Sequence, residues 1–101
     1  MYARAVTLDL DTQMWDELSE FGASIKDRIS GFPGLISWVL VANPDTGKGT
    51  SFSLFEDEQA FIAVNDRINE IVADFGRFFT APPSEILGDV MVHLDAGTDS
   101  P

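Results

Sequence analysis

The first third of the chain changes from an alternating to a helical pattern of apolar positions. Residues 3–10, "ARAVTLDL", place every second side chain on one face, which predicts a strand. That face carries Arg4, Val6, Leu8 and Leu10. Asp11 or Thr12 can then cap a helix, in which apolar residues recur every three or four positions up to Ser30-Gly31. The predicted buried stripe of this helix is Met14, Leu18, Phe21, Ile25 and Ile29.

Both patterns return in the second part of the chain. Residues 32–43 and 49–56 predict a second and a third strand, of which the second is apolar on both faces. The second strand is predicted to place Leu35, Val39 and Val41 on one face, and Ile36, Trp38, Leu40 and Ala42 on the other. Asp57 can cap a second helix that stops at Gly76. Residues 86–96, "ILGDVMVHLDA", predict a fourth strand.

The order βαββαβ has no break in composition, so we expect a single domain over residues 1–96 and a flexible tail over residues 97–101. The order predicts an α+β, ferredoxin-like fold, in which two helices cover one face of an antiparallel four-stranded sheet. The other face then still carries apolar side chains. Because large apolar patches are rare on monomers, we expect a symmetric homodimer that stacks two sheets into a barrel.

The amino-acid composition excludes several classes of functional site and disfavours several kinds of partner. The 101 residues include no cysteine, which excludes disulfides, zinc–thiolate sites, iron–sulfur clusters and thiol nucleophiles. Seventeen acidic against six basic residues give a net charge of −11, which disfavours nucleic acid and anionic membrane surfaces as partners. Neither a signal peptide nor a membrane span is evident, so we expect a soluble, cytoplasmic protein.

Residues 43–51, "NPDTGKGTS", contain the residue types of a phosphate-binding loop but not the spacing of that motif. The first glycine of such a loop is replaced by Ala42, and Gly49 stands where Ser or Thr should follow Lys48. The segment also joins two strands, so no helix N-terminus faces a phosphate. We predict a hairpin instead, in which Gly47 and Gly49 allow a positive φ or a bulge and Asp45 bonds its own backbone.

Several turn and cap motifs resemble one family. They are Pro33-Gly34 before the second strand, the "PDTG" hairpin, "LFEDEQAF" after the third strand, and Pro82-Pro83-Ser84-Glu85 before the fourth. With them, residues 31–65 look like the central segment of the antibiotic biosynthesis monooxygenase-like family of the dimeric α/β barrel superfamily. The resemblance implies a cofactor-independent monooxygenase that acts on polyketide-like or quinol-like aromatic molecules.

The same superfamily includes haem-degrading enzymes. Haem degradation is disfavoured for this chain, because it lacks the residues on which that branch relies. That branch relies on an Asn in strand one, a Trp just after strand three and a His on helix two. In this chain the first strand has no Asn, Phe55 occupies the Trp place and Val64 lies near the His place.

Five residues are candidates for a site. His93, the single histidine, could act as a general base if Asp89 or Asp95 orients it. The candidates for ligand binding are Asn65, Arg67, Trp38 and Phe78. Each also has a structural interpretation, as a solvent-facing helix residue or as packing in the core or at a dimer interface. No spacing supplies a metal site, and we expect no cofactor.

Three functions stay open on these observations. The first is a dimeric monooxygenase of small apolar or aromatic molecules that needs no metal or flavin. The second is a non-catalytic dimeric module that binds a small molecule or a partner. The third is an isomerase or another small-molecule enzyme on the same barrel.

Overall fold

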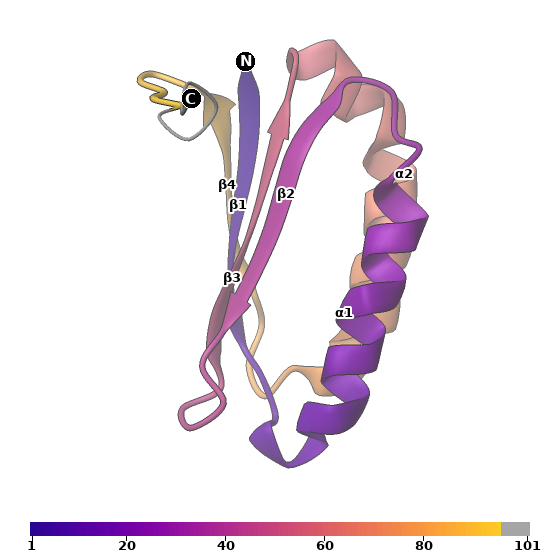
Figure 1. The fold of residues 1–101 in the computed structure, drawn as a ribbon, viewed down its shortest axis with the longest axis vertical. Coiled ribbons are helices and arrows are strands. Elements are labelled where there is room, and N and C mark those ends of the chain that lie inside the picture. The colour runs from indigo at the N-terminus through magenta and orange to yellow at the C-terminus, as the bar shows by residue number, and fades with distance from the viewer. Residues whose placement is uncertain (96–101) are drawn as a thin grey trace, which may run out of the picture.

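The computed structural model describes residues 1–95 and shows a sheet covered on one side by two helices (Figure 1). Ala96 and the predicted tail over residues 97–101 lie outside the described residues. The elements are β1 (Tyr2–Asp9), α1 (Trp15–Ile29), β2 (Leu35–Ala42), β3 (Lys48–Phe55), α2 (Glu58–Phe75) and β4 (Ser84–Asp89). Short 3₁₀ turns, η1 (Thr12–Met14) and η2 (Gly76–Phe78), precede α1 and follow α2.

The sheet has the order β2-β3-β1-β4, and every neighbouring pair is antiparallel. Both helices lie on the same face, which we call the inner face, and the opposite face is the outer face (Figure 1). This is the ferredoxin-like α+β arrangement, so the predicted fold class is confirmed.

Short polar side chains set the helix starts. The Asp57 carboxylate accepts a hydrogen bond of 2.8 Å from the backbone N–H of Ala60, which is the predicted cap of α2. Asp11 accepts one of 3.0 Å from the N–H of Gln13. Asp11 therefore caps the η1 turn, and α1 begins three residues later than its cap alone would suggest, at Trp15.

The hairpin between β2 and β3 is confirmed. The side-chain oxygen of Asn43 accepts the N–H groups of Asp45 at 2.8 Å and Thr46 at 3.2 Å, so Asn43 organises the turn rather than Asp45. Gly47 has a φ of 76°, and a Cβ there would lie 2.2 Å from the carbonyl oxygen of Leu10. Only glycine suits that position, because the turn packs directly against the chain that leaves β1.

The core lies between the inner face and the helices. Its most buried side chains are Phe55 of β3 and Phe78 of η2, at 1% and 0% exposure. The apolar positions that recur every three or four residues along α2 face this core. Val72 among them is half-buried, and five are buried: Phe61, Val64, Ile68, Ile71 and Phe75. Aromatic rings pack edge to face within this layer, as between Phe55 and Phe61, whose centroids are 5.6 Å apart.

One prediction about β2 is wrong. The pairing with β3 shifts between Leu35 and Ser37, which is a β-bulge. A bulge inserts one residue and reverses the alternation, so Leu35 packs into the core and Ile36 is exposed, the opposite of the predicted faces.

The fourth strand is also shorter than predicted. β4 ends at Asp89 because Asp89 pairs with Tyr2, the first residue of β1, and no partner strand continues beyond it. Residues 90–95 are therefore not strand, and the prediction that His93 lies on it is wrong.

Among residues 1–95, neither helix is long and apolar enough to cross a membrane. The cytoplasmic location stays a prediction.

Candidate functional site

A cavity of about 250 Å³ lies between the inner face and the helices. We call it the helix–sheet cavity. All four strands and both helices contribute to its lining. Its walls are mostly apolar, and they include Val6, Leu8, Ile25, Ile29, Leu35, Phe55, Ile68, Ile71, Val72, Phe75 and Phe79. Apolar walls with a few convergent polar groups are typical of a small-molecule site.

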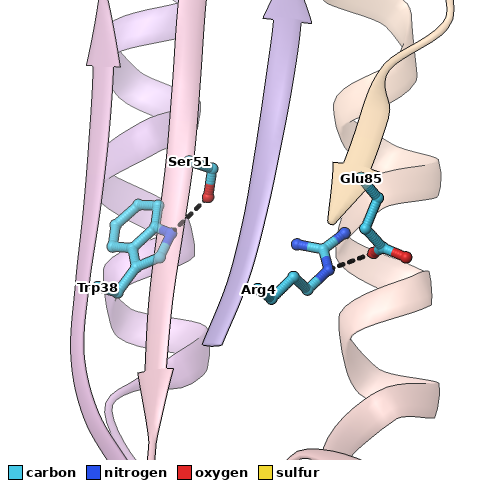
Figure 2. Close-up of polar contacts among 4 residues, drawn as sticks. All are labelled: Arg4, Trp38, Ser51 and Glu85. Carbon is cyan, nitrogen blue, oxygen red and sulfur yellow. Dashed lines mark hydrogen bonds and ion pairs between the residues drawn. The ribbon is translucent and has the colours of Figure 1, made fainter. Parts of the chain in front are cut away.

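Two polar pairs interrupt these apolar walls (Figure 2). The indole Nε1 of Trp38 donates a hydrogen bond of 2.9 Å to Oγ of Ser51, which links β2 with β3. Nε of Arg4 donates to Oε2 of Glu85 at 2.5 Å, which links β1 with β4. The four side chains thus provide an aromatic platform and an ion pair in one cavity.

Strand register brings the ion pair together. Arg4 lies opposite Leu87, and Glu85 lies opposite Val6 two positions along the same face. Diagonal neighbours on one face of a sheet are within reach of long side chains. The pairing of β1 with β4 therefore places Arg4 and Glu85 side by side although 81 residues separate them in the chain.

Stability does not explain why this ion pair lies on the inner face. The Arg4 side chain is 11% exposed, so the guanidinium loses most of its hydration. The Glu85 side chain is 44% exposed, and solvent screening limits such a pair to about 0–1 kcal/mol. An apolar residue at position 4 would match its neighbours on β1 without that cost of desolvation.

Tyr2 lies at the edge of the aromatic core, with its ring 5.6 Å from that of Phe61. Burial raises the pKa of its phenol above the ordinary value of 10.0, and the carboxylates of Glu58, Asp89 and Glu85 raise it further. Tyr2 does not line the cavity. Within residues 1–95, no three acidic or histidine side chains gather closely enough to hold a metal ion.

Two of the predicted site residues belong to the core layer, and one of them lines the cavity. Trp38 lines it, and its role in ligand binding stays a prediction. Phe78 is fully buried and packs against Phe21, with centroids 5.4 Å apart, while the Arg77 guanidinium lies 4.4 Å from its ring centroid. Phe78 does not line the cavity.

The other three predicted residues lie elsewhere. Asn65 is half-buried on α2 and Arg67 is exposed, with its guanidinium 5.9 Å from the ring centroid of Phe32. His93 is exposed in the segment after β4. None of the three lines the helix–sheet cavity, and their roles in binding or catalysis stay predictions.

The cavity also contains polar residues that are not among the five predicted candidates. They are Arg4, Glu85, Ser51, Ser53 and Asn69. Arg4 could have been identified from the sequence, because the alternation places it on the same strand face as Val6, Leu8 and Leu10. A charged residue on an otherwise apolar face of a strand indicates a partner or a function.

The fold and the cavity define a ferredoxin-like domain with a mostly apolar cavity between sheet and helices. Several solved structures share this fold. A monooxygenase of Streptomyces coelicolor, ActVA-Orf6, solved in complex with nanaomycin D, aligns over 92% of this chain and 89% of its own at 19% identity, with a TM-score of 0.72. SnoaB of Streptomyces nogalater, a cofactor-independent oxygenase, aligns over 92% and 95% at 12% identity, with a TM-score of 0.74.

The protein NE2512 of Nitrosomonas europaea, whose function is unknown, aligns over 95% of both chains at 21% identity, with a TM-score of 0.73. No protein-family model and no curated protein matches the sequence. The chain therefore has the fold of the antibiotic biosynthesis monooxygenases, and the predicted resemblance is confirmed at the level of fold.

Proposed function

We propose that the helix–sheet cavity binds a small aromatic molecule and that the protein oxygenates it with molecular oxygen, without a metal or a flavin. The observation that carries the proposal is the cavity itself, with apolar walls, the Trp38 ring and one ion pair. Such walls favour a flat apolar ligand, and the polar groups can fix its orientation.

The volume limits the size of the ligand. At about 250 Å³, the cavity is slightly smaller than the roughly 300–1,000 Å³ typical of small-molecule pockets. We therefore propose a ligand of one or two fused rings. The shared fold supports the oxygenase proposal, because one neighbour is a monooxygenase solved with nanaomycin D and another is a cofactor-independent oxygenase.

A hydroxylated naphthalene illustrates the proposed reaction. A base removes the hydroxyl proton, and the electron-rich ring carbon para to that oxygen reacts with O₂ to form a hydroperoxide. Loss of water then leaves a quinone carbonyl at that carbon. One oxygen atom enters the product and the other leaves as water, and the substrate supplies all the electrons.

Glu85 is the carboxylate that lines the cavity, so we propose it as the base. The sequence alone suggested His93 for this role. His93 lies beyond the end of β4 and does not line the cavity.

The test is oxygenation of 1,5-dihydroxynaphthalene under isotopically labelled O₂. The protein should raise the rate of 5-hydroxy-1,4-naphthoquinone formation above that of buffer, and the product should carry one labelled atom. Glu85→Gln should lower the protein-dependent rate by about 10²–10⁴-fold. Glu20→Gln, which removes an exposed carboxylate of α1, is the matched control.

The result also separates the alternatives. If the compound binds but the protein does not accelerate its oxidation, the domain is a binding module rather than an oxygenase. Native mass spectrometry of the freshly purified protein complements the assay, because a retained molecule would identify the class of ligand directly.

We also propose that the protein is a symmetric homodimer. The outer face carries an apolar row across all four strands, formed by Val39, Phe52, Ala5 and Ile86. Ile86 is 73% exposed and Val39 is 49% exposed, and large apolar patches are rare on monomers. Light scattering should give twice the chain mass of 11.1 kDa. A mass of one chain at micromolar concentration would contradict the dimer.

A further inference from the structure

We propose that Arg4 recognises an oxygen atom of the aromatic ligand and stabilises it in the ionised form, so that the ligand binds as a phenolate or enolate. This inference rests on the proposed function, since it requires an aromatic molecule in the helix–sheet cavity. It adds the ionisation state of the bound ligand and a role for one residue.

The first argument is the unused hydrogen-bonding capacity of Arg4. A guanidinium carries five N–H donors. Nε uses one of them on Glu85, and within residues 1–95 the structure records no hydrogen bond from the two terminal nitrogens. In Figure 2 those two nitrogens carry no dashed contact to the other side chains drawn. Four donors are thus left for an acceptor that enters the cavity.

The second argument is the apolar environment of those donors. The Arg4 side chain is 11% exposed and lies among the apolar residues of the cavity. Charged groups interact more strongly in such surroundings than in water. The terminal nitrogens of Arg4 are not sealed off, because within residues 1–95 no fully buried side-chain nitrogen or oxygen is without a hydrogen-bond partner, so an entering ligand can reach them. A ligand oxygen with negative charge would satisfy these donors better than a neutral one would.

The third argument is that the cavity holds one charge of each sign. Among the lining residues, Arg4 of β1 is the only cation and Glu85 of β4 the only anion, and α1 and α2 contribute none. A cation beside a phenol lowers the pKa of that phenol, and an anion raises it. The two side chains should therefore shift the ionisation of a bound phenol in opposite directions.

The experiment uses 7-hydroxycoumarin, a two-ring phenol whose phenolate has its own absorbance band. The bound probe is titrated with pH in the wild-type protein and in two variants. Arg4→Gln should raise the pKa of the bound phenol by about one to three units, because Glu85 and the apolar walls then act without the cation. Glu85→Gln should lower it, because Arg4 then acts without the anion.

A matched control removes an arginine from an ion pair outside the cavity. Arg28 of α1 donates to Asp74 of α2 at 2.9 Å, and neither residue lines the cavity. Arg28→Gln should leave the pKa of the bound probe unchanged. Thermal unfolding followed by circular dichroism shows whether each variant is folded, so a purely structural role of Arg4 is measured separately from the titration.

Each outcome decides one claim. If the probe binds and Arg4→Gln does not raise its pKa, Arg4 does not contact the ligand oxygen and this inference is wrong, while the cavity remains a binding site. If the probe does not bind to the wild-type protein at all, the proposed function is contradicted as well. If Arg4→Gln does not fold, a crystal structure of the wild-type protein with 7-hydroxycoumarin decides. A phenolic oxygen within hydrogen-bonding distance of the terminal nitrogens of Arg4 supports the inference, and a phenolic oxygen placed elsewhere overturns it.

Discussion

The two faces of the sheet are built from the same four strands but differ in the polarity of their side chains. One register row on the inner face consists of Trp38, Ser53, Arg4 and Leu87. It combines a ring, a hydroxyl and a charge beneath two helices. The neighbouring row on the outer face, Val39, Phe52, Ala5 and Ile86, is entirely apolar and has no cover within residues 1–95.

In these two rows the distribution is the reverse of what burial alone would produce, whereas the rest of the inner face forms one wall of the apolar core. Polar groups are normally hydrated and apolar groups buried, yet the covered face contains the ion pair and the uncovered face contains the apolar row. Each reversal is unfavourable for a single chain in water. This difference supports both proposals, a ligand in the cavity on the inner face and a second copy of the chain on the outer face.

The largest effect should come from the inner face. Phe55 is 1% exposed, so Phe55→Ala should lower the free energy of unfolding by about 3–5 kcal/mol through lost burial and a cavity. Phe52→Ala makes the same deletion on the outer face of β3, where the ring is 39% exposed, and should cost clearly less. Urea denaturation at low protein concentration measures both. Equal losses would show that the two faces do not differ in burial.

The second largest effect should come from a charge placed on the outer face. Ile86→Lys introduces a charge into the apolar row and should weaken the dimer by about 100-fold or more, because a buried unpaired charge is strongly unfavourable. Light scattering over a dilution series gives the dissociation constant. Ile62→Lys is the control, since Ile62 is 54% exposed on α2 and away from the sheet. Equal effects of the two variants would contradict an interface on the outer face.

A smaller effect should follow from the polar pair at the cavity wall. Trp38→Phe keeps an aromatic ring but removes the N–H that donates to Ser51 at 2.9 Å, which should lower the free energy of unfolding by about 0.5–1.5 kcal/mol.

Fluorescence quenching locates the ligand relative to Trp38. Trp15→Phe leaves Trp38 as the only tryptophan, and 7-hydroxycoumarin should still quench its fluorescence. If quenching persists in Trp38→Phe and is lost in Trp15→Phe, the ligand lies outside the helix–sheet cavity.

The smallest effect concerns Tyr2 in alkali. Because the pKa of its phenol is raised in the folded protein, the stability from this group is fully present below pH 10.0 and is lost as the pH rises through the folded-state pKa. Tyr2→Phe should therefore lose less stability above pH 10.0 than the wild type does. Urea denaturation on both sides of that pH tests this, and identical losses in both proteins would contradict it.

Most of the fold was predictable because it depends on local patterns. The alternation along β1, the helical stripes and the cap at Asp57 involve residues that are close in sequence, and the structure confirms them. The bulge at Leu35 and the end of β4 at Asp89 depend on which strands pair, and local patterns do not contain that information.

The candidate site was less predictable for the same reason. Arg4 and Glu85 are neighbours only through the pairing of β1 with β4, and Trp38 and Ser51 only through the pairing of β2 with β3. His93 was a candidate because it is the single histidine, and that compositional feature does not indicate where the side chain lies in the fold. Arg4 was detectable as the charged member of an apolar face.

The most direct test of the central claim is a crystal structure of the protein with 7-hydroxycoumarin. We expect the ring system between the sheet and the helices, against Trp38, with its phenolic oxygen within hydrogen-bonding distance of the terminal nitrogens of Arg4. An empty helix–sheet cavity with the compound bound on the outer face or elsewhere would contradict it.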